Sequence, residues 1–253
     1  MPWQRAPQPS EQHPFALAFA RRPGARRRID LETGVAVAVF DLGAWRPLLE
    51  GIEALVGAEA AARATRQRIP GNRDALLATY ALQRLWIAEL LGLPPARVEL
   101  ARDERGRPCL ADARLHTSLS HAGERAALAL TATGPVGVDL EPADRARDMP
   151  ELEERVAHPL ERRALPAAAD ARGHALLRLW VRKEALLKAA GIGLELEMDR
   201  FQAPEGVALP LPGPVFGGRA VRLQALDGGR GWVLALASVP DAAPCLLEPL
   251  ADR

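Results

Sequence analysis

Cysteine is scarce in this chain of 253 residues: Cys109 and Cys245 are the only two, and they lie far apart. Neither belongs to a CxxC or Cys/His spacing, so the sequence predicts no disulfide framework and no zinc site. Long apolar runs are missing too, because no stretch approaches the roughly 20 residues that cross a bilayer. These absences exclude an integral membrane protein with a helical span and favour the reducing cytoplasm.

A strong charge imbalance is also absent, since the formal net charge is +1. This near-neutral balance argues against a protein-wide field that attracts nucleic acid. Charge is nevertheless uneven, because residues 1–30 hold six arginines against Glu11 and Asp30. We expect this basic N-terminal extension to be a solvated tail. With 48% apolar residues, the chain as a whole can bury one sizeable core or two small ones.

Lysine is the rarest of the common charged residues here, because 31 of the 33 basic residues are arginine. Both lysines, Lys183 and Lys188, fall in the segment WVRKEALLK. An ammonium group is more compact than a guanidinium group, so this concentration indicates that a compact cation is needed in that segment.

Hydrophobic periodicity predicts short strands alternating with helices. In the first half, residues 31–134, strands are expected over 35–40 and 126–131 and helices over about 50–67 and 74–91. In the second half, residues 135–253, the expected elements are a strand over 136–140, helices near 151–165 and 174–190, and further strands. The pattern predicts two mixed halves.

The segment VGVDLEP places Asp139 and Glu141 two residues apart on a predicted strand. Alternate residues of a strand point to the same face, so both carboxylates are expected on one side at the strand's end. Such a pair suits a hard cation that also binds substrate phosphates. The alternative interpretation is a solvated acidic turn before Pro142.

The segment RLWVRKEALLKAAGIGL spaces Trp180, Glu184 and Lys188 four residues apart, which puts them on one helix face. A carboxylate there can complete a metal shell, and an ammonium one turn later can neutralise a phosphate. The alternative is an ordinary Glu–Lys surface pair beside a core tryptophan.

Four motifs occur in a fixed order: GRP at 106–108, LSH at 119–121, GVDLE at 137–141 and WVRKEALLK at 180–188. In this combination the chain resembles the 4′-phosphopantetheinyl transferase family, and specifically its longer, pseudo-dimeric Sfp-type branch, over roughly residues 35–240. The resemblance implies an α+β fold of two pseudo-symmetric halves. Each half would be a small, mainly antiparallel sheet packed with helices, with the active site in the cleft between them.

The resemblance also implies roles for individual residues. Asp139, Glu141 and Glu184 would hold magnesium on the pyrophosphate of coenzyme A, and Lys188 would contact that pyrophosphate. Ser120 and His121 would engage the phosphate at the adenosine end. The remaining implied contacts are Arg107, where the family has lysine, Glu161 as a base or metal candidate, and a cationic cluster containing Arg63 and Arg66.

Two positions depart from the family pattern. Ser118 replaces an asparagine, and Ala122 replaces the last serine of an SHS motif. The hydrogen bonds that those family residues make are therefore not expected here.

The expected activity is transfer of 4′-phosphopantetheine from coenzyme A to a serine of an apo carrier protein, with release of adenosine 3′,5′-bisphosphate. The base that deprotonates the serine is Glu184, Glu161 or a metal-bound water. A pseudo-dimer completes its own site, so we expect a monomer.

The carrier, whether of fatty-acid, polyketide or peptide biosynthesis, is not identified. Alternatives are a metal-dependent pyrophosphohydrolase of coenzyme A or a related nucleotide, and a non-catalytic homologue that binds coenzyme A or a carrier.

Overall fold

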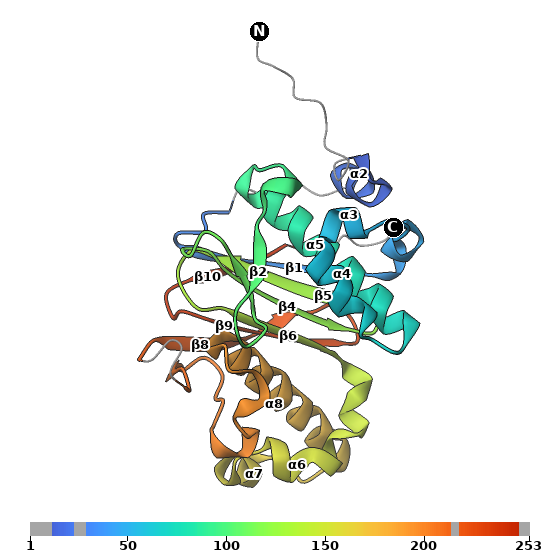
Figure 1. Cartoon of the computed structure of the whole chain (residues 1–253). Coiled ribbons are helices and arrows are strands. Elements are labelled where there is room, and N and C mark those ends of the chain that lie inside the picture. The colour runs from blue at the N-terminus through green and yellow to red at the C-terminus, as the bar shows by residue number, and fades with distance from the viewer. Residues whose placement is uncertain (1–11, 23–28, 214–217, 248–253) are drawn as a thin grey trace.

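A computed structural model of the chain describes residues 12–22, 29–213 and 218–247. Two four-stranded sheets are stacked in the middle of the molecule, and helices cover the outer face of each (Figure 1). The protein therefore has four layers: helices, sheet, sheet, helices. The predicted α+β class, with small sheets that are mainly antiparallel, is confirmed.

The first sheet has the strand order β10-β1-β5-β4. Its members are β1 (Gly34–Asp41), β4 (His116–Ala122), β5 (Arg125–Thr131) and β10 (Ala243–Leu247). β5 pairs antiparallel with both β1 and β4, whereas β10 lies parallel to β1. A strand from late in the chain thus completes the sheet that the first half begins.

The second sheet has the order β6-β9-β8-β7, and all its pairings are antiparallel. Its strands are β6 (Gly137–Pro142), β7 (Ala208–Pro210), β8 (Ala220–Asp227) and β9 (Trp232–Ser238). A separate hairpin of β2 (Leu100–Arg102) and β3 (Pro108–Leu110) carries the turn at Gly106, whose φ of 79° suits glycine.

Helices of the first half cover the first sheet. They are α2 (Pro14–Arg21), α3 (Glu53–Val56), α4 (Ala58–Thr65) and α5 (Pro70–Leu91). Helix α5 begins at Pro70 and ends at Gly92 in the left-handed conformation, the usual order of a proline start and a glycine stop. The helix expected over 50–67 is divided at Gly57, whose φ of 88° ends α3 and starts α4.

The N-terminal region differs from the expected solvated tail at residues 14–21. These residues form α2, whose Phe15 and Phe19 are buried in the first core beside Trp45. An apolar FALAF segment gains more from this burial than it would from solvation, despite the arginines around it. Residues 1–11 and 23–28 of the expected extension lie outside the described residues.

Helices of the second half cover the second sheet: α6 (Glu153–Val156), α7 (Pro159–Ala164) and α8 (Ala169–Ala190). Helix α8 packs its apolar side, including Leu176 and Leu186, against β8 and β9. Short 3-10 turns connect the longer elements; they span Gly43–Leu48, Pro95–Arg97, Ala143–Arg147, Met149–Leu152, Gly193–Glu195 and Met198–Arg200. Within the described part of the chain, no helix is both long and apolar enough to span a membrane.

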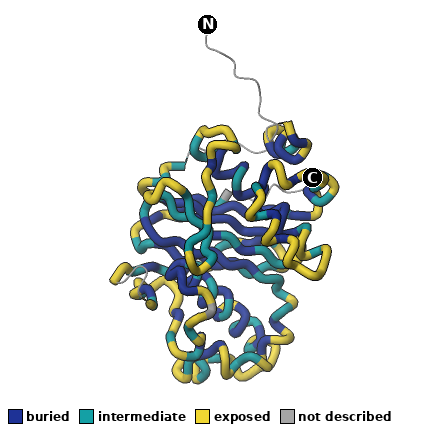
Figure 2. The backbone as a smooth tube through the Cα atoms, in the orientation of Figure 1, coloured by how far each residue is buried: buried dark blue, intermediate teal, exposed yellow. Residues whose placement is uncertain are grey.

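A third apolar cluster fills the space between the two sheets, where Figure 2 shows a continuous buried zone. It joins Val35, Val37 and Val39 of β1 to Val138 and Leu140 of β6 and to Leu234 and Leu236 of β9. The stacking brings edge strand β4 beside edge strand β6, where the Val138 N–H donates to Ser118 Oγ at 3.1 Å. The predicted residues Ser120 and His121 lie on β4, Asp139 and Glu141 on β6, and Glu184 and Lys188 on α8.

Candidate active site

Strand β6 separates its apolar and acidic side chains onto opposite faces. Val138 and Leu140 point into the cluster between the sheets, so Asp139 and Glu141 point the other way, toward α8. Helix α8 can approach because Gly137 has no side chain: a Cβ there would lie 1.9 Å from the carbonyl oxygen of Ala185. The predicted pairing of a strand end with a helix face is therefore present.

Asp139 is 4% exposed, and its two oxygens have different surroundings. Oδ1 accepts hydrogen bonds from Lys188 Nζ at 2.6 Å and from Ser120 Oγ at 2.7 Å. Oδ2 is buried and has no hydrogen-bond partner in the described structure. Since a buried carboxylate oxygen without a partner is costly, Oδ2 marks a place for a cation or a donor from outside the chain.

Glu141 pairs with Arg145, which lies four residues later in the 3-10 turn after β6. The Arg145 guanidinium also lies over the ring of Trp180 on α8, 4.6 Å from the ring centroid. Burial, and then the charge of Asp139, raise the pKa of Glu141, and Arg145 opposes this rise. Arg145 thus supplies part of the positive charge that balances the acidic cluster.

Glu184 lies one turn before Lys188 on α8 and completes this acidic cluster. Burial raises its pKa to about 7, and the negative charges of Asp139 and Glu141 add to the rise. Lys188 and Arg145 act in the opposite direction. Three carboxylates therefore share a region in which two nearby cations only partly compensate them.

The donors of this cluster fit a hard divalent cation, because they are carboxylate oxygens and one of them has no partner. In the described residues, however, no three His, Cys, Asp or Glu side chains already stand close enough together to ligate one ion. Glu141 pairs with Arg145 and Asp139 pairs with Lys188, so both carboxylates have a cationic partner in this structure.

The two predicted residues of the LSH motif are directed differently. Ser120 donates to Asp139 instead of facing open solvent, and it is 6% exposed. His121 has a buried Nε2 with no partner in the described structure. Burial lowers the pKa of His121, as does the positive charge of Lys188, so its imidazole is neutral near pH 7.

The GRP turn lies between α4 and the end of α8. Arg63 of α4 approaches Gly106, where an added Cβ would be 3.7 Å from Arg63 Nη1. Arg107 is held by Asp103 at 2.9 Å and lies against Gly191, the residue that ends α8 after Lys188. The exposed Arg66 stands at the end of α4. The structure thus brings Arg63 and Arg107 to the same turn, beside the helix that carries Lys188.

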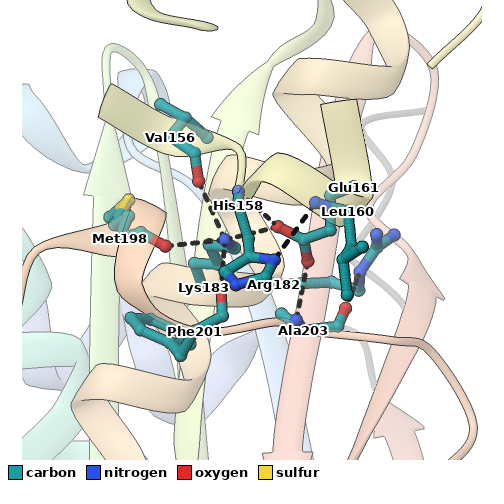
Figure 3. Close-up of polar contacts among 9 residues, drawn as sticks. All are labelled: Val156, His158, Leu160, Glu161, Arg182, Lys183, Met198, Phe201 and Ala203. Atoms are coloured by element: carbon teal, nitrogen blue, oxygen red, sulfur yellow. Dashed lines mark hydrogen bonds and ion pairs between the residues drawn. The ribbon is translucent and has the colours of Figure 1, made fainter. Parts of the chain in front are cut away.

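Glu161 makes a different set of contacts, away from the acidic cluster, which Figure 3 shows. Its oxygens accept from the N–H groups of His158 at 2.9 Å and Ala203 at 2.8 Å, and it pairs with Lys183 at 2.6 Å. Lys183 is fully buried and also donates to the carbonyl oxygens of Val156, Met198 and Phe201. These contacts join α6, α7 and the 198–203 segment to α8.

Sequence reasoning missed Arg145 and did not give Lys183 its own role. Arg145 is one of many arginines, and only its spacing of four from Glu141 could have drawn attention to it. For Lys183 a signal was present, because it is one of two lysines in an arginine-rich chain. A guanidinium is larger than an ammonium, and the buried position of Lys183 explains why lysine occurs there.

Comparison with known proteins adds an independent line of support. A sequence profile of the 4′-phosphopantetheinyl transferase superfamily matches residues 135–223, which include β6 and α8. A 4′-phosphopantetheinyl transferase of Bacillus subtilis is 30% identical over 162 residues, which cover 62% of this chain and 71% of the relative. The chain belongs to the 4′-phosphopantetheinyl transferase superfamily. It is therefore an enzyme that transfers a phosphopantetheinyl group, as the order of the four motifs predicted.

Other phosphopantetheinyl transferases show similar likeness. The transferase HetI of Nostoc sp. is 31% identical over 58% of this chain and 64% of the relative. A phosphopantetheinyl transferase of Thraustochytrium sp. is 34% identical over 59% of this chain and 57% of the relative. The chain thus spans somewhat under two thirds of the length of these two relatives.

Proposed function

We propose that this phosphopantetheinyl transferase uses coenzyme A and Mg²⁺ to modify a serine of an apo carrier protein. The observation that carries the proposal is the meeting of Asp139, Glu141 and Glu184 with Lys188 where β6 faces α8. Such a combination of oxygen ligands and a fixed ammonium is suited to a pyrophosphate bridged to a metal ion.

In this proposal the chain's own groups bind and orient the pyrophosphate. Asp139, Glu141 and Glu184 would hold Mg²⁺, which when bound would neutralise charge on the phosphate oxygens. Lys188 leaves Asp139 Oδ1, its partner in the present structure, and contacts the pyrophosphate. Because Lys188 is held on α8 beside the acidic cluster, its charge would lie close to the place where charge develops on the leaving oxygen.

The reaction forms one bond and breaks one. The carrier's serine oxygen attacks the pantetheine-side phosphorus, and the bond from that phosphorus to the bridging oxygen breaks. Adenosine 3′,5′-bisphosphate leaves with the bridging oxygen. Of the two carboxylates considered as bases, Glu184 is the better candidate to take the serine proton, because it lies in the acidic cluster one turn before Lys188, whereas Glu161 is fully engaged with Lys183, His158 and Ala203.

The nucleotide end of coenzyme A would lie toward the GRP turn. Arg63, Arg66 and Arg107 supply positive charge there, and His121 offers a buried nitrogen without a partner. Arg107 carries a full charge and a fork of donors, so it replaces the family's lysine without loss of phosphate binding.

The test is to incubate the protein, coenzyme A and Mg²⁺ with a panel of apo carriers from fatty-acid, polyketide and peptide biosynthesis. We expect one of them to gain the mass of a single phosphopantetheine, whereas its Ser→Ala variant and a chelator control gain none. Lys188→Ala should cripple transfer without unfolding the protein. Arg178→Ala, an exposed cation on the same helix, should leave transfer unchanged.

The panel also separates the alternative activities. Release of adenosine 3′,5′-bisphosphate without a carrier would instead identify a pyrophosphohydrolase, and coenzyme A binding without any turnover would identify a non-catalytic homologue. The carrier that is modified identifies the pathway, whether fatty-acid or secondary metabolism.

We also propose that the protein is a cytoplasmic monomer, consistent with its two free cysteines. Chromatography with light scattering tests the oligomeric state.

A further inference from the structure

Strand β4 directs consecutive residues of the LSH motif to opposite sides of the first sheet. Ser118 and Ser120 pair in register with Ala129 and Ala127 of β5, which face the cluster between the sheets. Leu119 and His121 pair with Leu128 and Ala126, which face the helical layer of the first half. Directly opposed residues of an antiparallel pair share a face, so Ser120 and His121 point in opposite directions.

The hydroxyl of Ser120 meets a single carboxylate oxygen of the acidic cluster. Ser120 Oγ lies 2.7 Å from Asp139 Oδ1, and Lys188 Nζ lies 2.6 Å from the same atom. Both donors therefore act on Oδ1, and Oδ2 is left buried and unpartnered in the described structure. This asymmetry fixes which oxygen of Asp139 is available to a ligand.

We propose that Ser120 is a positioning residue of the cation site, which holds Asp139 so that Oδ2 is presented to the metal. This inference rests on the proposed function, and it differs from the contact with an adenosine-end phosphate that the resemblance implies for Ser120. The hydroxyl matters more once substrate is bound. When Lys188 moves to the pyrophosphate, Ser120 is the donor that remains on Oδ1 and keeps the carboxylate from rotating.

The same strand geometry directs His121 to the other face of the first sheet, where it would bind the nucleotide. Its Nε2 is buried without a partner, and its face of the sheet is the one that α5 covers. The LSH motif would therefore contact two ligands from opposite faces of β4. Ser120 acts on the cation through Asp139, and His121 acts on the nucleotide.

Calorimetry without a carrier protein tests this division in two titrations. Mn²⁺, as a probe for Mg²⁺, is added to protein saturated with coenzyme A, and adenosine 3′,5′-bisphosphate is added to the free protein in the absence of metal. We expect Ser120→Ala to weaken Mn²⁺ binding about 10-fold or more, because loss of an outer partner of a metal ligand usually costs about 10–100-fold. Binding of adenosine 3′,5′-bisphosphate should stay within about 2-fold of wild type. Ser120→Cys keeps the side-chain volume with a weaker donor, so it should show an intermediate loss.

Two neighbours on the strand are matched controls. Ser118→Ala removes a hydroxyl from the same face, one that accepts from Val138 N and does not contact Asp139. It should lower the melting temperature without changing Mn²⁺ affinity. His121→Ala should show the reverse of Ser120→Ala, with weaker bisphosphate binding and unchanged Mn²⁺ binding.

The outcomes separate this inference from the proposed function. If wild type binds Mn²⁺ and modifies a carrier, but folded Ser120→Ala binds Mn²⁺ equally well, the positioning role is wrong. Weakened bisphosphate binding with unchanged Mn²⁺ binding in Ser120→Ala would restore the phosphate contact instead. If wild type neither binds Mn²⁺ nor modifies any carrier, the proposed function itself fails and this inference fails with it.

Discussion

At the scale of single residues, the acidic cluster links ionisation to stability. Glu184 has a pKa of about 7 in the folded protein, against 4.5 as its ordinary value. Between these pH values the folded state binds more protons than the unfolded state, so the free energy of unfolding falls as pH rises through this window. The unliganded enzyme is therefore least stable, with respect to this group, above pH 7.

Glu184→Gln removes this dependence because glutamine stays neutral. At pH 8 we expect the variant to be more stable than wild type by on the order of 2 kcal/mol, or roughly 4–8 °C in melting temperature. At pH 4.5 the two proteins should melt within about 1 °C, since wild-type Glu184 is then protonated in the folded state. Thermal unfolding at both pH values in a chelating buffer is the measurement. An equal difference at both would show that packing, and not ionisation, separates them.

Lys183 is a residue whose loss should cost much stability. Its ammonium satisfies three backbone carbonyls and the Glu161 carboxylate, all inside the protein (Figure 3). Lys183→Met leaves Glu161 without its buried counter-ion, so we expect denaturant unfolding to show a loss of about 3–5 kcal/mol. Arg178→Met, which changes an exposed cation of the same helix, should cost less than about 0.5 kcal/mol.

Glu161→Gln distinguishes a structural glutamate from a catalytic base. Glutamine keeps one acceptor oxygen but loses the charge that faces Lys183, so stability should fall while the folded fraction retains transfer. The rate is measured at a temperature at which the variant is folded. A drop of about 100-fold or more under those conditions would support base duty for Glu161 after all.

At the scale of elements, the approach of α8 to β6 sets the geometry of the site. A Cβ on Gly137 would lie 1.9 Å from the Ala185 carbonyl oxygen and 2.6 Å from the Ala189 nitrogen. Both atoms belong to helix backbone, so they cannot rotate away. The residues that follow Glu184 and Lys188 therefore rest directly against the strand that carries Asp139.

Gly137→Ala should push α8 away from β6 and separate Lys188 from Asp139. We expect transfer to fall by about 100-fold, the loss that a misplacement of about 1 Å can cause, and stability to fall by about 1–3 kcal/mol from overpacking. Carrier modification followed by mass spectrometry and denaturant unfolding give the two numbers. Gly71→Ala on α5, where an added Cβ meets nothing closer than 3.9 Å, should change neither. Normal activity in Gly137→Ala would show that the site tolerates a displaced helix.

Elements and motifs were predictable from the sequence to different degrees. The carboxylate pair of β6 and the Glu184–Lys188 face of α8 follow from strand and helix periodicity, so both were expected before the fold was known. The contact of Ser120 with Asp139 was not predicted, because it depends on the stacking of two sheets. Helix α2 was missed because the arginines around it in the sequence drew attention away from its apolar residues, which the first core buries.

At the scale of the whole molecule, the two halves share one interior. The cluster between the sheets takes Val37 from β1, Val138 from β6 and Leu236 from β9, and β10 returns from the end of the described chain to pair with β1. Neither half, divided near residue 134, can bury these side chains alone. The two halves, divided at that point, are therefore not independent folding units.

Hydrogen exchange can measure this coupling without any substitution. If the halves unfold together, the most protected amides of β5, central in the first sheet, and of β9, central in the second, should exchange with the same opening free energy. That value should also match the global free energy of unfolding from denaturant titration and depend equally on denaturant concentration. Exchange followed by mass spectrometry of peptides over 125–131 and 232–238 gives both values. Opening of one sheet at a clearly lower free energy would mean that the candidate site, formed where β6 meets β4 and α8, can come apart without global unfolding.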